Sequence, residues 1–329
     1  MTVGERGEHA LLDWLRRHVP APGADVIIGI GDDAAVLQPT RGSLLVQTTD
    51  ASVDGVHFDL RWSTPADVGR RAVAVNLSDL AAMGARPSWL LLSLVLPVTL
   101  PVAAFEALVT AVSDAARHAG AALVGGNITR TSGPLVVDVT ATGHVRPRRV
   151  LRRDAARHGD ELWLTGSIGA AAAGLAMLRA GELADMACVA RYKVPTPRLH
   201  DAWAMARDRA ARAAVDLSDG LADAVRQLTA ASGAGARIDA ACLPIEPGAR
   251  CWFDAHGQDP VEAALGASDD YEMLFAVAPK AKGRMRAARV ASATPFTCIG
   301  TLTKKAGCVL VRDGVDAPLP SGFEHFASV

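Results

Sequence analysis

The sequence predicts an α/β or α+β protein of two domains. The chain has 329 residues, which is long enough for two hydrophobic cores. Segments with strand and helix patterns alternate in both halves, as they do in proteins that pack helices on sheets. A basic stretch with few apolar residues, 144–160, interrupts this alternation near the middle. We therefore expect domains at residues 1–146 and 147–329.

The first half combines amphipathic and Ala-rich helical patterns with apolar strands. Leu11 and Leu15 follow helical spacing and predict a helix over 5–19. A second helix is expected over 65–83, because Gly84 follows it as a helix terminator. We further expect a helix at 101–119 and strands at 26–30, 43–49, 90–96 and 135–145. One more strand is expected to lead into the segment 123–130.

The second half repeats the alternation with shorter elements. The Gly-rich segment 165–174 lacks the spacing of a dinucleotide-binding loop, so we interpret its small residues as a means of close helix–strand packing. We expect strands at 161–165, 213–217, 236–240, 272–278, 297–302 and 308–312, and helices at 167–180, 198–211 and 219–231.

Composition excludes several classes of protein. A net charge of −1 gives no electrostatic reason to expect nucleic acid or an anionic membrane as a partner. The five cysteines are scattered and never form a C-x-x-C pair, which argues against a disulfide framework or a zinc site. Residues 1–19 lack the apolar core of a signal peptide, and the apolar run 90–102 is too short to span a bilayer. We expect a cytoplasmic globular protein.

Acidic residues recur beside apolar strands and turns. Asp32 and Asp33 follow the β-branched run 26–30, and the first 192 residues contain no lysine that could pair with them. Buried charge is costly without a counter-ion, and Mg²⁺ prefers carboxylate and phosphate oxygens. The pattern therefore predicts a phosphate site with several metal ions. The acid-rich segments are 31–37, 48–58, 74–87, 215–224 and 267–274.

Taken singly, these acids have simpler interpretations. Asp219 fits the N-cap of the helix that follows it, and Asp50 and Asp54 fit turns. Asp79 fits a solvated position on the helix that also carries Asn76. The chain has neither a Walker loop nor the lysine strand and H-R-D loop of protein kinases, so its phosphate chemistry would depend on metal ions.

Taken together, the motifs resemble the thiamine-monophosphate kinase family. They occur in the order GIGDDAAVL, TTD, DGVHF, AVNLSDLAAMGA, GGNITR, DLSDGL, DDYE and GFEHF, and they span nearly the whole chain. The resemblance implies the two-domain fold of aminoimidazole ribonucleotide synthetase. It also implies a homodimer in which the N-terminal domains pair through their strands into a barrel. ATP and several Mg²⁺ ions are then expected in the cleft between the two domains.

The resemblance also assigns roles to individual residues. Asp33, Asp79 and Asp216 are the expected catalytic acids. Alone, His57 would be a structural histidine and Phe323 a C-terminal core anchor. The implied metal ligands are Asp33, Thr49, Asp50, Asp79, Asp216 and Asp219; the implied ATP contacts are Gly126, Asn127, Arg153 and Ser218; and the implied substrate contacts are His57, Asp269 and Phe323.

The reaction implied is transfer of the ATP γ-phosphoryl group to thiamine monophosphate, which gives thiamine diphosphate. The sequence departs from the family at three of these positions or their neighbours. Asn127 stands where the family has Asp, Ala51 where it has Thr, and Asp269 where it has Glu. These departures keep two alternatives open: a paralogous ATP-using enzyme with another small substrate, and a non-catalytic sensor of thiamine phosphates or nucleotides.

Overall fold

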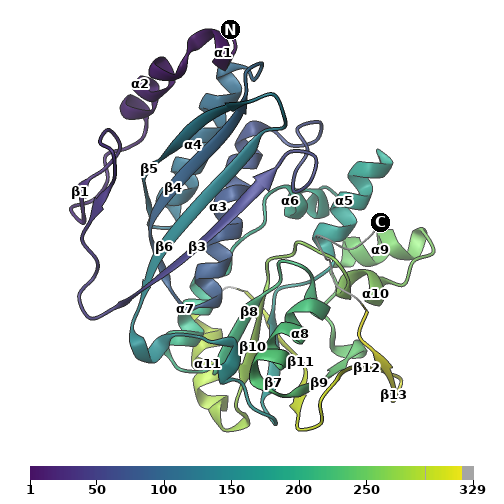
Figure 1. The fold of residues 1–329 in the computed structure, drawn as a ribbon. Coiled ribbons are helices and arrows are strands. Elements are labelled where there is room, and N and C mark those ends of the chain that lie inside the picture. The colour runs from purple at the N-terminus through teal and green to yellow at the C-terminus, as the bar shows by residue number, and fades with distance from the viewer. Residues whose placement is uncertain (293, 321–329) are drawn as a thin grey trace. The chain divides into compact units, whose positions relative to one another are not determined.

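The computed structural model describes residues 1–292 and 294–320. Contacts divide the chain into two compact units (Figure 1). The N-terminal unit comprises residues 1–80 and 85–147, and the C-terminal unit comprises residues 81–84 and 148 onward. The expected substrate contact Phe323 lies outside the described residues.

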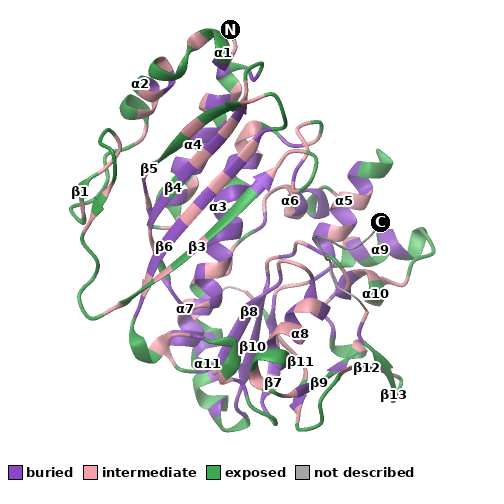
Figure 2. Ribbon diagram, viewed as in Figure 1, coloured by how far each residue is buried: buried purple, intermediate pink, exposed green. Residues whose placement is uncertain are grey.

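The N-terminal unit is built on a four-stranded sheet. Its strands are ordered β3 (Leu44–Val53), β6 (Val136–Val145), β4 (Arg86–Pro97) and β5 (Ala122–Thr131). The β4–β5 pair is parallel, and the other two pairs are antiparallel. Helices α3 (Pro65–Ala82) and α4 (Val102–His118) lie along one face of this sheet (Figures 1 and 2). The helices expected at 65–83 and 101–119 are therefore present.

The start of the chain differs from expectation. The single helix expected over 5–19 is divided into α1 (Val3–Arg6) and α2 (Glu8–His18), because Gly7 adopts a φ of 79° between them. The short strands β1 (Val26–Ile28) and β2 (Val36–Leu37) form a separate antiparallel pair. Their β-branched side chains are exposed, Ile27 at 59% and Val36 at 45%, so the expectation of a buried strand beside the acid pair is wrong.

The C-terminal unit contains a seven-stranded sheet that is antiparallel except where β9 meets β12. In spatial order its strands are β13 (Val315–Pro318), β12 (Cys308–Arg312), β9 (Gly235–Asp239), β11 (Phe296–Thr303), β7 (Glu161–Thr165), β10 (Met273–Val277) and β8 (Ala213–Asp216). The helices are α5 (Ala170–Ala180), α6 (Met186–Lys193), α7 (Leu199–Arg207), α8 (Leu221–Ser232), α9 (Pro247–Ala255), α10 (Pro260–Leu265) and α11 (Lys282–Ala291), with short 3₁₀ turns η1 (Pro147–Arg149), η2 (Arg153–Ala155), η3 (Ala240–Cys242) and η4 (Pro279–Ala281).

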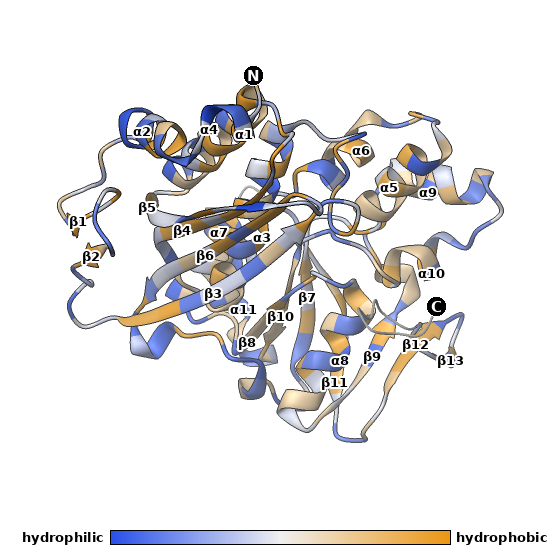
Figure 3. Ribbon diagram, turned by 45° about the horizontal axis from the view of Figure 1, so that its top comes forward, coloured by the Kyte–Doolittle hydropathy of each residue, from blue (hydrophilic) through white to orange (hydrophobic). Residues whose placement is uncertain are grey.

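Both faces of this second sheet are covered. Along β10, Leu274 packs in a core shared with Leu228 of α8, and Phe275 packs in a core shared with Met205 of α7 and Met285 of α11. Successive strand residues point to opposite faces, so a strand buried on both sides is apolar throughout. The continuous hydrophobic colouring of β10 in Figure 3 reflects this position.

Some C-terminal helices end early or were not predicted. The helix expected over 198–211 stops at Arg207, because Arg209 adopts a left-handed φ of 51°. Helices α6, α9, α10 and α11 were not expected from the sequence. None of the helices within the described ranges is long and apolar enough to cross a membrane.

Candidate active site

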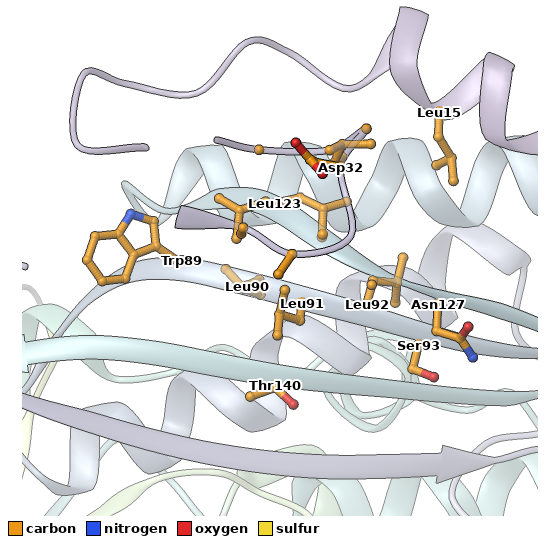
Figure 4. A pocket seen from close by; sticks show the side chains of 18 of the residues that line it. Leu15, Asp32, Trp89, Leu90, Leu91, Leu92, Ser93, Leu123, Asn127 and Thr140 are labelled. Carbon is orange, nitrogen blue, oxygen red and sulfur yellow. The ribbon is translucent and has the colours of Figure 1, made fainter. Parts of the chain in front are cut away.

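A cavity of about 780 Å³ lies on the face of the N-terminal sheet that α3 and α4 leave uncovered. Its lining comes from α2, the loop 29–35 and strands β3 to β6. Asp33, Gly126 and Asn127 are among the lining residues, so the structure brings these three expected site residues together. Figure 4 shows Asp32 on the loop above the strands that carry Ser93 and Asn127.

The loop that carries the two acids is held by its own side chain. Asp32 Oδ1 accepts a hydrogen bond of 2.8 Å from the backbone N–H of Asp33, so Asp32 holds the turn. Gly31 provides a φ of 128°, which residues with a Cβ rarely adopt. The Asp33 side chain is exposed at the cavity and is therefore accessible to a ligand.

The second glycine of the GGNITR segment has a structural cause in the β4–β5 pairing. Gly126 adopts a φ of 155°, and a Cβ at this position would lie 1.8 Å from the carbonyl oxygen of Leu92. Asn127 follows it opposite Ser93. The tight strand contact therefore fixes the backbone immediately before the amide that lines the cavity.

Thr49 reaches the same face of the sheet from β3. Its hydroxyl donates to Asp138 Oδ1 at 3.0 Å and lies 3.1 Å from the hydroxyl of Thr140. Asp138 and Thr140 both line the cavity, although sequence reasoning singled out neither of them. The alternation of polar residues at 138, 140 and 142 within an apolar strand was the available signal.

Other expected ligands of this unit lie on the opposite side of the sheet. The Thr48 hydroxyl donates to Asp79 Oδ2 on α3. Because side chains alternate along a strand, Asp50 belongs on the Thr48 side and not on the Thr49 side. Asp50 pairs with Val139 inside the strand ladder, so its interpretation as a turn residue is wrong. The acids of this unit thus form two groups and not one.

Helix α3 also carries an unusual buried amide. Asn76 is fully buried, and its Nδ2 donates to the carbonyl of Ala72 at 2.9 Å. Its Oδ1 has no hydrogen-bond partner among the described residues. Asn76 lies one turn before Asp79 on the same helix face. A buried acceptor without a donor is costly, and a cation would satisfy it.

His57 has a structural role in the turn after β3. Its Nδ1 accepts the backbone N–H of Val53 at 3.1 Å, which leaves the proton on Nε2. Asp54 accepts the N–H of Leu60 at 3.1 Å in the same turn. This agrees with the interpretation of Asp54 as a turn residue.

In the C-terminal unit, the expected ligands cluster where β8 leads into α8. Asp216 is buried at the end of β8, and the hydroxyl of Ser218 donates to Asp219 Oδ2 at 2.7 Å. The N-cap of α8 is Gly220, which provides no side-chain cap. The N-cap interpretation of Asp219 is therefore wrong. Only glycine fits at 220, because a Cβ there would lie 1.8 Å from the carbonyl oxygen of Gly266.

The turn that contains Asp269 is tied to the same segment. The N–H of Leu217 donates to the carbonyl of Glu272 at 2.9 Å, and the N–H of Tyr271 donates to the carbonyl of Leu217 at 3.0 Å. Asp269, which is half-buried, therefore belongs to the segment that pairs with the 216–219 stretch. Arg153 is exposed in η2 of the same unit.

A buried carboxylate that the sequence reasoning missed anchors this turn. Glu272 is fully buried, and its carboxylate accepts hydrogen bonds from Arg191 at 2.8 Å, Arg198 Nε at 2.7 Å and Thr165 at 2.6 Å. Arg198 also donates through Nη2, which makes this pair bidentate. The two arginines flank a Pro-containing connection in the sequence, but nothing in their spacing identified the partner.

The neighbouring Asp270 is also buried and structural. It accepts the N–H groups of Gly169 at 2.7 Å and Ala171 at 3.1 Å, at the beginning of α5, together with the hydroxyl of Ser268 at 2.8 Å. Burial raises the pKa of Asp270, and these three hydrogen bonds oppose that increase. Asp270 therefore fixes α5 against the turn that holds Asp269.

The Gly-rich segment 165–174 serves close packing, as predicted, but against helices and not against a strand. A Cβ at Gly174 would lie 2.2 Å from the carbonyl oxygen of Cys188 in α6. A Cβ at Gly169 would lie 2.9 Å from the Cβ of Ala264 in α10.

Comparison with known proteins assigns the family. Residues 31–145 match the N-terminal domain, and residues 157–313 the C-terminal domain, of AIR synthase related proteins. The thiamine-monophosphate kinase of Escherichia coli K12 is 38% identical over 98% of this chain and 99% of that protein. The chain belongs to the thiamine-monophosphate kinase family. The enzyme of the same name from Synechococcus elongatus is 35% identical over 99% of this chain and 98% of its own length.

Solved structures agree with this assignment to the thiamine-monophosphate kinase family. The crystal structure of the kinase from Stenotrophomonas maltophilia K279a superposes with a TM-score of 0.83 at 37% identity, over 94% of this chain and 98% of that one. A structure of AaThiL complexed with AMPPCP and TMP has a TM-score of 0.77 at 31% identity, over 99% of both chains. The hydrogenase maturation protein HypE shares the fold at 20% identity, with a TM-score of 0.80. The predicted family and two-domain fold are thereby confirmed.

Proposed function

We propose that the protein phosphorylates thiamine monophosphate with ATP and releases thiamine diphosphate. The observation that carries the proposal is near-complete coverage, at up to 38% identity, by enzymes named thiamine-monophosphate kinase. A relative at 31% identity has been solved with AMPPCP and TMP, which supports the same pair of substrates.

Mg²⁺ is the metal that the donor atoms favour. On the cavity face of the sheet, Asp33, Thr49 and Asn127 offer carboxylate, hydroxyl and amide oxygens. On the opposite side, next to Asp79, Asn76 Oδ1 is an acceptor in need of a donor or cation. No group of three or more His, Cys, Asp or Glu in the described parts of the chain is arranged to hold a metal by itself. This suits Mg²⁺, which takes one or two carboxylates and completes its shell with phosphate oxygens and water. When bound, Mg²⁺ would neutralise charge on the phosphates.

The chain's own residues would position two polyanionic substrates. In the C-terminal unit, Asp216, Ser218 and Asp219 would bind metal and nucleotide, with Asp219 kept in place by the hydroxyl of Ser218. In the N-terminal unit, Asp79 and Asp50 would take the corresponding role, with Asp79 held by Thr48. Alignment of the reacting groups and electrostatic stabilisation then supply most of the rate enhancement.

Proton transfer and covalent catalysis are not required. The acceptor is a phosphate oxygen that is already anionic near neutral pH, so direct in-line attack on the γ-phosphoryl group needs no strong base. The remaining implied contacts are Arg153 and Gly126 for ATP, and His57, Asp269 and Phe323 for the thiamine phosphate.

We further propose that the protein is a cytoplasmic homodimer. Exposed apolar side chains on β1, β2, β3 and β4 support pairing through the N-terminal unit, since soluble proteins usually cover such surfaces. These side chains are Ile27 at 59%, Val36 at 45%, Leu44 at 48%, Leu45 at 49% and Leu91 at 41% exposure. Sedimentation that gives a monomer at micromolar concentration would contradict this part.

The activity is tested by a product assay. Purified protein incubated with ATP, Mg²⁺ and thiamine monophosphate should form thiamine diphosphate, and Asp79→Asn or Asp216→Asn should nearly abolish it. Asp114→Asn and Asp316→Asn are matched controls, because both residues are exposed acids whose carboxylates form surface ion pairs with Arg117 and Arg237. Turnover that survives excess chelator would contradict the metal requirement. Binding of both ligands without product over hours would instead identify a sensor.

A further inference from the structure

The C-terminal unit has a second hollow, away from the residues assigned to the kinase reaction. It has a volume of about 270 Å³ and lies where residues 209–212 lead into β8 and residues 278–281 leave β10. Asp216 is at the other end of β8, paired with Met273 of β10. A strand advances about 3.3 Å per residue, so roughly 10 Å separates the two ends of β8.

The floor of this hollow is apolar. It consists of small side chains and one leucine, all of which belong to the core cluster that contains Phe275. Alanine side chains fill little volume, so the surface is hollowed there. The floor residues are Leu151, Ala206, Ala210, Ala211, Ala278 and Ala281.

The rim is entirely cationic. Among the described residues no acid lines the hollow, and its six basic residues come from three stretches, 148–149, 209–212 and 280–284. Arg212 is paired with Asp160 at 2.8 Å, and Arg149 is one of the groups that lower the pKa of Asp208. The other four form no ion pair within the described ranges. The rim residues are Arg148, Arg149, Arg209, Arg212, Lys280 and Arg284.

One rim residue occupies a position that normally favours glycine. Arg209 has a φ of 51° directly after α7, and the N–H of Ala210 donates to the carbonyl of Met205 at 2.9 Å to close the helix end. Glycine is usual in such a left-handed cap, because a residue with a Cβ is strained there. Strain that persists at a surface position points to a function for the side chain, here a positive charge at the hollow.

Helix α11 presents its N-terminus to the same hollow. Its N-cap residue, Ala281, lines the hollow and provides no side-chain hydrogen bond. The first turn contains no acid and instead carries Lys282 and Arg284. Helix N-termini favour anions and disfavour cations, so this arrangement is unfavourable until an anion binds.

We propose that this hollow binds a di- or triphosphate group, either free or carried by a small organic molecule. A single phosphate monoester carries roughly −1.5 to −2, so linked phosphates are needed to balance this rim. The volume is below the roughly 300–1,000 Å³ of pockets for larger ligands, which favours a compact anion. The net charge of −1 offers no long-range attraction to nucleic acid.

The proposal is tested by calorimetric titration of the full chain with inorganic triphosphate, in the presence of EDTA. Lys280→Ala/Arg284→Ala should weaken binding by about tenfold or more, since two charge-assisted contacts are lost. Arg209→Gly should weaken binding by about threefold or more while the melting temperature stays equal or rises, because the strain is relieved. The matched control is Arg286→Ala on the same helix, which lines a different hollow and should bind within about twofold of wild type.

These variants also separate this site from the proposed kinase centre, because they should leave kinase turnover unchanged. A parallel titration with thiamine diphosphate distinguishes a free phosphate chain from one carried by an organic molecule. Tighter binding of inorganic triphosphate indicates the free form, and tighter binding of thiamine diphosphate indicates the carried form. Either result supports the proposal if the binding is lost in the rim variants. Triphosphate binding that is absent, or that is unchanged in both rim variants, would overturn it. An equal loss in Arg286→Ala would also overturn it, since that result indicates diffuse surface attraction. The proposal would also be overturned if a single-stranded RNA displaced triphosphate and its affinity fell as much in Arg286→Ala as in the rim variants.

Discussion

Replacing Glu272 with glutamine should destabilise the C-terminal unit more than any surface change. The substitution keeps the shape of the side chain but removes its negative charge. Two arginines then lose their counter-ion in a fully buried position. The hydroxyl of Thr165, whose oxygen also accepts the backbone N–H of Met273 at the start of β10, loses a charged acceptor.

The size of the effect follows from burial and geometry. Breaking a buried ion pair by removal of one partner costs about 3–5 kcal/mol. The side chains of Arg191 and Arg198 are 22% and 16% exposed, so each regains some hydration when the carboxylate is lost. We therefore expect a loss at the lower end, about 3 kcal/mol in the free energy of unfolding.

The measurement is urea unfolding combined with hydrogen exchange of the β7 and β10 amides, which report on the C-terminal unit alone. A double-mutant cycle with Arg198→Met isolates the pair, and we expect a coupling energy above about 1.5 kcal/mol. Glu161→Gln is the matched control, because Glu161 lies at the partly exposed end of β7.

The reasoning would be refuted by a loss below about 1 kcal/mol in Glu272→Gln, or by a cycle that is additive within about 0.5 kcal/mol. Either result would mean that hydration replaces the carboxylate, and that the turn containing Asp269 is held by its backbone hydrogen bonds alone.

Three further predictions follow from single contacts. Gly174→Ala should cost about 3 kcal/mol in thermal unfolding, since its Cβ would lie 2.2 Å from a backbone oxygen, whereas the open helical position Gly283 should tolerate alanine without loss. Burial raises the pKa of Cys188 to about 12, so at about pH 8 iodoacetamide should modify the exposed Cys251 and spare Cys188. Mass spectrometry of the alkylated peptides measures this, and equal modification of the two cysteines would contradict the burial of Cys188. Asn127→Asp should lower the Mg²⁺ concentration for half-maximal rate several-fold, and an unchanged requirement would place residue 127 away from the metal.

The sequence predicted the elements whose local signals agree with their final packing. Helix α3 has regular apolar spacing and a terminating Gly84, and its predicted and observed bounds agree within one residue. The central strand β10 was similarly clear, because its continuous apolar run matches burial on both faces.

Local patterns misled where the packing partner lies elsewhere. The run 26–30 has the composition of a buried strand, yet β1 is exposed in the chain as it stands. An apolar pattern predicts that a surface will be buried, but it does not indicate whether the packing partner comes from the same chain or from another molecule.

Site residues were predictable when a motif carried them and not when only the fold did. Asp33 and Asn127 were found through their motifs, and both line the N-terminal cavity. Asp138 and Glu272 were missed, because their partners are 89 and 107 residues away in the chain at Thr49 and Thr165. The alternation at 138, 140 and 142 marks a polar face of the strand, but no local pattern identifies a partner so far away in the chain.

The most direct test of the proposed function follows the phosphoryl group itself. ATP labelled with radioactive phosphorus at the γ position is incubated with the protein, Mg²⁺ and thiamine monophosphate, and the products are separated by chromatography. We expect label in thiamine diphosphate, in amounts equal to the ADP formed, and none of this label with Asp216→Asn. Label found only in inorganic phosphate, or ADP formed without any dependence on thiamine monophosphate, would contradict the proposed function.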